Sequence, residues 1–99
     1  MNLLIIDGGK LELRSDRGSF IRTIAHRDVV DADLNDDGMI LVTLINGKVE
    51  LRKENGSFVR TIAYRDAVSA RWNGENVLIR LSNGKMELRK ENGSFIRTV

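Results

Sequence analysis

The stretch "GKVELRKENGSFVRTI", residues 47–62, occurs three times with small changes in this chain of 99 residues. The other copies are "GKLELRSDRGSFIRTI" at residues 9–24 and "GKMELRKENGSFIRTV" at residues 84–99. The period is therefore 38 residues (47 − 9) and then 37 residues (84 − 47). The connecting segments also match, since "IAHRDVVDADLN" from Ile24 is similar to "IAYRDAVSARWN" from Ile62. Self-similarity at such a period is typical of architectures in which one supersecondary unit is repeated.

Each unit contains four short segments in which apolar and polar residues alternate. In the middle unit they are "VVDADL" (29–34), "MILVTLI" (39–45), "KVELRK" (48–53) and "SFVRTI" (57–62). This alternation predicts four β-strands, which we name a, b, c and d in order. Asn-Gly dipeptides separate most of them and predict two-residue type I′ loops, because both residues of that loop need a positive φ. The segments "AHRD" and "AYRD" contain no glycine and predict a looser link between units.

The chain begins inside strand b of its first unit, because Met1 aligns with Met39. The expected strand order is therefore bcd, abcd, abcd, which gives eleven strands. We expect a single repeat domain over residues 1–99, with units at 1–25, 26–63 and 64–99.

With two-residue loops, one face of each unit is apolar. In the middle unit this face carries Val42, Leu44, Val49, Leu51, Phe58 and Ile62, and in the last unit Ile79, Leu81, Met86, Leu88, Phe95 and Val99. The opposite face is mixed, and the Glu-x-Arg pair of strand c is expected there as a solvent-exposed ladder of charges. The arginines of strand d, Arg22, Arg60 and Arg97, fall on the apolar face, where we expect them to extend along its outer edge to solvent. A small sheet with one apolar face has to pack against its neighbours.

Four antiparallel strands in about 38 residues, with tight turns inside the unit and a looser link between units, resemble the blade of a β-propeller. The resemblance is to WD-like blades and covers nearly the whole chain. Two signatures of that family are missing, since "HRD" and "YRD" stand where a Gly-His pair would precede strand a, and "ELRKE" stands where Trp-Asp would end strand c. The resemblance therefore implies an all-β fold of about 2.75 four-stranded blades, with no WD hydrogen-bond network.

Propellers close with four to eight blades, so three blades leave apolar faces uncovered. We therefore expect the ring to close by homo-oligomerisation, with a dimer favoured, as in small propellers that assemble from partial-ring chains. The alternative fold is a monomeric β-trefoil, which also uses three four-stranded units. A truncated or engineered piece of a longer repeat protein is a further alternative.

Composition narrows the classes of function. The net charge is +2, and sixteen basic residues are interleaved with fourteen acidic ones without a basic tract, so nucleic acid is not the expected partner. One histidine, no cysteine and no phosphate-binding loop indicate no enzyme, no cofactor and no metal site. No long apolar run or basic leader is present, so we expect no membrane partner and a cytoplasmic location.

The candidate binding residues lie in the less repetitive segments between the copies. They are His26, Arg27 and Asp28 in the first link, Tyr64, Arg65 and Asp66 in the second, and Arg71 and Trp72 in the following strand. A ring beside an Arg and an Asp suits a carbohydrate or another polar ligand at the rim loops, whereas local ion pairs and turn caps explain the same residues without a ligand. Trp72 is either a core residue or a stacking surface. The expected function is a non-enzymatic binding module, possible ligands being a glycan or a protein, and the alternative is a scaffold without a ligand.

Overall fold

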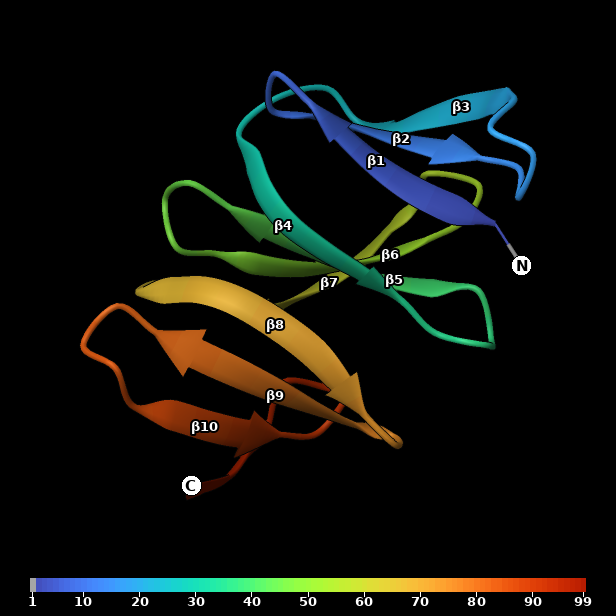
Figure 1. Cartoon of the computed structure of the whole chain (residues 1–99). Helices are drawn as coiled ribbons and strands as arrows, with labels where there is room; N and C mark the ends of the chain where they lie inside the picture. Colours follow the sequence, from blue (N-terminus) through green and yellow to red (C-terminus); the bar gives the residue numbers. More distant parts are fainter. Residues whose placement is uncertain (1) are drawn as a thin grey trace.

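The computed structural model describes residues 2–99, which form eleven β-strands in three antiparallel sheets (Figure 1). Blade 1 contains β1 (Leu3–Asp7), β2 (Lys10–Arg14) and β3 (Phe20–Ala25). Blade 2 contains β4 (Val29–Leu34), β5 (Met39–Leu44), β6 (Val49–Lys53) and β7 (Phe58–Ala63). Blade 3 contains β8 (Ala67–Asn73), β9 (Asn76–Leu81), β10 (Met86–Arg89) and β11 (Phe95–Thr98). The predicted all-β fold of eleven strands is confirmed.

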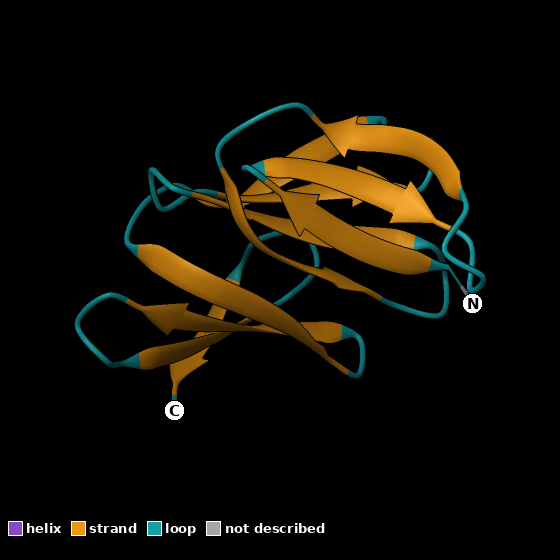
Figure 2. Cartoon of the chain, turned by 45° about the horizontal axis from the view of Figure 1, so that its top comes forward, coloured by secondary structure: helices purple, strands orange, loops and turns teal. Residues whose placement is uncertain are grey.

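Within each sheet the strands pair in sequence order as a meander, a to d in blades 2 and 3 and b to d in blade 1. Strand a is β4 in blade 2 and β8 in blade 3, and we call these two the inner strands. Figure 2 shows strands joined by loops throughout the described part of the chain. Accordingly, residues 2–99 include no helix long and apolar enough to cross a membrane.

The hairpin between strands b and c differs from the predicted two-residue loop. The Leu44 N–H donates to the carbonyl of Lys48 (2.9 Å), so the loop consists of the three residues 45–47. Gly47 has a φ of +88°, whereas Asn46 is not in the positive-φ region. This geometry is that of a turn followed by a glycine bulge, in which only one residue needs a positive φ. Of the described hairpins, that of Gly8 and Gly9, with φ of +58° and +83°, has positive φ at both loop residues.

The additional loop residue shifts the register and changes which side chains share a face. Leu41 pairs with Leu51, and Val42 pairs with Glu50. The predicted apolar set is therefore wrong, because a shift of one residue moves a strand's side chains to the opposite face. Phe58 pairs with Arg52 and is 52% exposed, which also corrects its predicted place in the core. The same correction holds in blade 3, where Ile79 pairs with Glu87 instead of sharing a face with Leu88.

We name the two faces of each blade by the residues of strand c. The Glu–Arg face carries Leu3, Ile5, Glu12 and Arg14 in blade 1, Ile40, Val42, Glu50 and Arg52 in blade 2, and Val77, Ile79, Glu87 and Arg89 in blade 3. The leucine face carries Leu4, Ile6, Leu11 and Leu13 in blade 1, Leu41, Thr43, Val49 and Leu51 in blade 2, and Leu78, Arg80, Met86 and Leu88 in blade 3. Both faces of strand b are apolar in blade 2.

The blades stack with the leucine face of one against the Glu–Arg face of the next. Leu11 and Leu13 of blade 1 form one buried cluster with Ile40 and Val42 of blade 2. The leucine face of blade 2 forms the second cluster with Val77 and Ile79 of blade 3. Blade 2 is thus covered on both sides (Figure 1), and each of its strand-b residues from Ile40 to Thr43 is fully buried. The two interfaces are repeats of one arrangement.

Candidate functional site

The backbone of each inter-blade link is held between two b–c hairpins. In the first link, Val29 N–H donates to the Gly9 carbonyl (2.9 Å) and Ile45 N–H donates to the Asp28 carbonyl (2.8 Å). In the second link, Ala67 N–H donates to Gly47 (3.1 Å) and Ser82 N–H to Asp66 (2.9 Å). The links therefore fix each new blade to the preceding one through backbone hydrogen bonds.

The aspartates of the links adopt an uncommon backbone conformation. Asp28 and Asp66 have φ of +67° and +68°, a left-handed region that Asp tolerates better than most residues. The chain passes close to Gly47, where an added Cβ would collide with the backbone N of Asp66 and lie 3.1 Å from the Arg65 carbonyl carbon. Asp and Gly are thus needed here for the backbone path, which is a structural use of the predicted link residues.

The side chains of the links are exposed at the rim. Arg27 lies 3.9 Å from Asp28, and Arg65 lies 3.9 Å from Asp66, both measured from Nε to a carboxylate oxygen. Ion pairs this exposed contribute little to stability. Tyr64 is 73% exposed. The local ion pairs predicted as the alternative to a ligand site are therefore present in both links.

Two equivalent cavities place the link residues beside the Glu-x-Arg pairs. One, of about 280 Å³, is lined by His26, Arg27 and Asp28 together with Glu50 and Arg52. The other, of about 300 Å³, is lined by Tyr64, Arg65, Asp66, Glu87 and Arg89. The structure therefore brings each predicted link triplet together with a charged pair from the following blade.

The Glu-x-Arg pairs bind the c–d hairpin of their own blade, and Arg52 also binds the preceding blade. Arg52 donates from Nε (3.1 Å) and Nη2 (3.0 Å) to Glu50 Oε1, and from Nη1 to the carbonyls of Gly56 (3.2 Å) and Ile24 (3.3 Å). Its guanidinium also lies 5.8 Å from the ring centre of Phe58. The arrangement recurs at Arg89, which donates to Glu87 and to the Gly93 carbonyl. These pairs are partly buried clamps on the c–d hairpin, which corrects the predicted solvent-exposed ladder.

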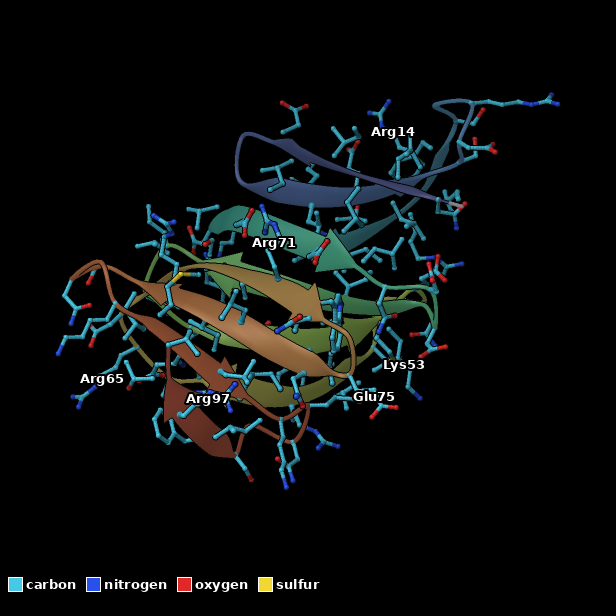
Figure 3. All side chains as sticks on the ribbon, turned by 60° about the horizontal axis from the view of Figure 1, so that its bottom comes forward. Arg14, Lys53, Arg65, Arg71, Glu75 and Arg97 are labelled. Carbon is cyan, nitrogen blue, oxygen red and sulfur yellow. The ribbon has the colours of Figure 1, made fainter. Side chains whose placement is uncertain are left out.

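Carboxylates of β4 bind the backbone of β8. Asp33 Oδ2 accepts a hydrogen bond from Trp72 N–H (2.8 Å), and Asp31 Oδ2 accepts one from Ala70 N–H (3.3 Å). Asp31 also accepts a hydrogen bond from Arg71 Nη1, so Arg71 extends from β8 toward β4 (Figure 3). This hydrogen bond is the main reason why the pKa of Arg71 is raised above its ordinary value. Arg71, a candidate binding residue, thus pairs with an acidic residue of the preceding inner strand.

Trp72 packs half-buried at the edge of the core, and its Nε1–H donates to the Met39 carbonyl (3.2 Å). Trp72 also lines a cavity of about 710 Å³, which is larger than the two link cavities. The cavity is lined by Asn35, Asp37, Arg60, Trp72, Gly74, Glu75, Asn76, Lys90, Glu91 and Asn92. This polar cavity lies at the a–b and c–d turns, and sequence reasoning missed it because turn residues from two blades build it.

The predicted site residues therefore fall into two groups. β8 begins at Ala67, next to the Tyr64–Asp66 link, and Trp72 lies near its other end. Because a strand rises about 3.3 Å per residue, Trp72 is far from that link. Figure 3 shows Arg65 and Glu75, which precede and follow β8, on opposite sides of the molecule. Within residues 2–99, no group of three or more His, Asp or Glu side chains is placed to hold a metal ion.

No protein-family model matches the sequence, and no curated protein matches it significantly. Solved structures do match. The WD40 domain of Neurospora crassa Pan2 matches with a TM-score of 0.75 and 12% identity over 100% of this chain and 35% of its own. PorZ, a surface component of the type-IX secretion system of Porphyromonas gingivalis, matches with a TM-score of 0.73 and 14% identity over 96% of this chain and 14% of its own.

BamB from Moraxella catarrhalis matches with a TM-score of 0.67 and 14% identity, covering 100% of this chain and 34% of its own. The chain thus spans about a third or less of each of these structures. At such identities the likeness concerns the fold alone. It confirms the predicted resemblance to propeller blades and shows that the β-trefoil alternative is wrong. The chain has the fold of a partial β-propeller of three blades, with three, four and four strands.

Proposed function

We propose that this chain is a non-enzymatic interaction module that completes a propeller ring by associating with a second copy of itself. The observation that carries the proposal is the repeated stacking of a leucine face on a Glu–Arg face. Within residues 2–99, the Glu–Arg face of blade 1 and the leucine face of blade 3 have no neighbouring blade, and they are the two halves of that same arrangement. Two chains would supply six blades, within the usual range for propellers.

Exposure of equivalent residues supports this proposal. Ile40, Val42, Val77 and Ile79 are all fully buried on the Glu–Arg faces of blades 2 and 3. On blade 1, the residues of the same face are 44% exposed at Leu3 and 39% exposed at Ile5. Burying such side chains contributes about 1.5–3 kcal/mol each when it is complete. A second copy would restore the burial that the other two blades already have.

The internal interface also supplies a template for polar contacts. Arg52 donates across the first interface to the carbonyl of Ile24. Between two copies, Arg14 of one copy would take the place of Arg52, and Val99 of the other copy would take the place of Ile24. Arg14 has an exposed side-chain fraction of 35%, against 24% for Arg52, as expected of a residue that lacks this neighbour. Head-to-tail contact of this kind is heterologous and closes only if the rotation completes a ring.

Sedimentation equilibrium tests the proposal. A chain of 11.2 kDa should form a species of 22.4 kDa (2 × 11.2), and Ile5→Asp should convert it to a folded monomer. Ile45→Asp is the matched control, because Ile45 is 73% exposed in a hairpin loop and lies on neither end face. A wild-type protein that is monomeric at every concentration tested would overturn the proposal.

A mixing experiment tests the head-to-tail geometry. Met86→Glu blocks the leucine face of blade 3, whereas Ile5→Asp blocks the Glu–Arg face of blade 1. Each variant alone should be monomeric, and an equimolar mixture should form a dimer through the two intact faces. An unchanged mass for the mixture would contradict a heterologous interface, because a symmetric contact is not restored by mixing.

A second candidate function is polar-ligand binding, which the 710 Å³ cavity beside Trp72 favours. Its polar turn residues and one aromatic wall suit a carbohydrate, in which hydroxyls bond to side chains and the ring packs on an indole. A glycan array separates the two candidate sites. Binding that is lost on Glu75→Gln and kept on Tyr64→Ala would assign the cavity, and the reverse would assign the link rim. No binding by the wild-type chain would leave the scaffold function alone.

A further inference from the structure

Strand β1 has an open hydrogen-bonding edge. In blades 2 and 3, strand b (β5 or β9) pairs on one side with strand c and on the other with an inner strand. In blade 1, strand b is β1, which pairs with β2 and has no inner strand beside it within residues 2–99. Exposed edges of this kind are templates for pairing with another strand.

The register identifies the amides at this edge. Asp7 and Lys10 close a two-residue loop and therefore form a hydrogen-bonded pair. Hydrogen-bonded and non-hydrogen-bonded pairs alternate along an antiparallel ladder. Leu4 and Ile6 consequently direct their N–H groups to the open edge, whereas Ile5 directs its N–H group to β2.

A second, independent feature lies on β4. The N–H groups of Ala70 and Trp72 in β8 are bound by carboxylates of the preceding inner strand. Ala32 and Leu34 of β4 occupy the positions that Ala70 and Trp72 occupy in β8. Ala32 pairs with Val42, and Ala70 pairs with Ile79, which is the equivalent residue of strand b. In the part of the chain that the structure describes, no side-chain acceptor reaches the N–H groups of Ala32 and Leu34. They lack the carboxylates that a preceding inner strand would supply.

One ligand satisfies both features. A strand paired to β1 would lie beside β4, as β4 lies beside β8, because β1 contacts β4 in the way that β5 contacts β8. Such a strand would offer backbone carbonyls to the N–H groups of Leu4 and Ile6. It would also offer two carboxylates, on residues two positions apart, to the N–H groups of Ala32 and Leu34. The sequence Val30-Asp31-Ala32-Asp33 of β4 has this pattern, whereas Val68-Ser69-Ala70-Arg71 of β8 does not.

We propose that the edge of β1 binds an extended peptide segment, supplied in trans, in which apolar residues alternate with two carboxylates. The main-chain hydrogen bonds of the added strand provide affinity, and the carboxylates select the sequence. The binding does not depend on self-association of the chain, since the edge of β1 and the end faces of the stack are different surfaces.

The test uses the full chain labelled with ¹⁵N and a capped peptide of residues 26–34, "HRDVVDADL". Amide hydrogen exchange should slow by about tenfold or more at Leu4, Ile6, Ala32 and Leu34 when the peptide is in excess. Ile5 is the internal control, because its N–H group is already bonded to β2. The alternating pattern along β1 is a readout that non-specific adsorption of the peptide does not produce.

Two control peptides test the role of the carboxylates. The same peptide with Asp31→Asn and Asp33→Asn should bind at least several-fold more weakly, and residues 64–72, "YRDAVSARW", should behave in the same way. Equal binding of all three peptides would overturn the carboxylate part of the proposal. No added protection at Leu4 and Ile6 with the peptide in excess would overturn the docking site itself.

Two further outcomes separate this proposal from self-association. The Ile5→Asp variant should still bind the peptide as a monomer, since the Ile5 side chain lies on the Glu–Arg face and not at the edge. If Leu4 and Ile6 are instead protected without peptide, and more so at higher protein concentration, a second copy occupies the edge and the proposal fails. Failure of the 22.4 kDa species to form would leave the peptide result unaffected.

Discussion

The interface between blades 2 and 3 and the interface between blades 1 and 2 share their apolar construction but differ at the inner edge. In both, a leucine face covers a Glu–Arg face and the contact residues are buried. Carboxylates of an inner strand bind across the interface of blades 2 and 3, where Asp31 and Asp33 accept hydrogen bonds from the backbone of β8, and within residues 2–99 no such carboxylate contact joins blades 1 and 2. Blades 1 and 2 are thus joined without inner carboxylates, by apolar stacking, hydrogen bonds of the link backbone and the hydrogen bond from Arg52 to Ile24. The inner carboxylates are an additional contact between blades 2 and 3.

The largest expected loss of stability comes from adding a side chain at Gly47, next to which the backbone of the second link passes. Gly47→Ala should destabilise the protein by about 3 kcal/mol, because a Cβ there meets the link backbone and the positive φ disfavours any side chain. Gly9→Ala should cost less, about 2 kcal/mol, since its Cβ would lie 3.1 Å from Asp28 N. Gly84→Ala has the same φ as Gly47 but no atom within 4 Å, and should cost about 1 kcal/mol.

Urea unfolding of the three variants measures this series. Equal losses for Gly47→Ala and Gly84→Ala would mean that the backbone strain alone matters and that the link does not pack against the hairpin.

The next effect comes from removing the inner carboxylates. Asp31→Ala with Asp33→Ala should cost about 2 kcal/mol, because each removes an acceptor from a backbone N–H of β8. Asp36→Ala with Asp37→Ala is the matched control, since it makes the same change in charge in an exposed turn. Urea unfolding followed by the fluorescence of Trp72, the one tryptophan, reports on this interface. Equal stability of the two double variants would show that apolar stacking alone positions blade 3.

The repeat was enough to predict the strands, their order and the resemblance to propeller blades. It predicted these well because alternation and turn residues act locally, and three copies make the same signal visible three times. The register could not be predicted, because Asn46-Gly47 fits both a two-residue loop and the observed three-residue loop. The additional loop residue decides whether Val42 or Leu41 pairs with Leu51, and hence which side chains of strand b share a face with Leu51.

The candidate site was predicted in part. The link triplets and Trp72 do border cavities, but their grouping depends on which end of a strand each occupies, and sequence proximity hides this. Tyr64 and Trp72 are eight positions apart yet border different cavities. The alternation along strand c does not reveal that Arg52 is partly buried, because its partners lie in the preceding blade and in the c–d turn.

A smaller effect, with the opposite sign, is expected within the interface of blades 2 and 3. Thr43 is fully buried on the leucine face, and its hydroxyl has no hydrogen-bond partner within residues 2–99. Thr43→Val keeps the shape and removes the unsatisfied group, so it should stabilise the protein by about 1 kcal/mol. Thr61→Val, at a half-exposed position, is the control and should change stability little. A loss of stability in Thr43→Val, measured by thermal unfolding, would indicate that the hydroxyl is bound in solution.

The smallest effect is expected where the link side chains are changed and its backbone is kept. Arg65→Ala removes an ion pair of 3.9 Å between largely exposed groups and should change the free energy of unfolding by less than about 0.5 kcal/mol. Arg27→Ala is the equivalent change at the other interface and should behave alike. A comparison of these variants with Gly47→Ala separates two roles of the link. Its backbone joins the blades, whereas its side chains are free to contact a ligand. A loss above 1 kcal/mol in urea unfolding of either Arg variant would instead assign its side chain to the structure, and would remove it from the candidate site.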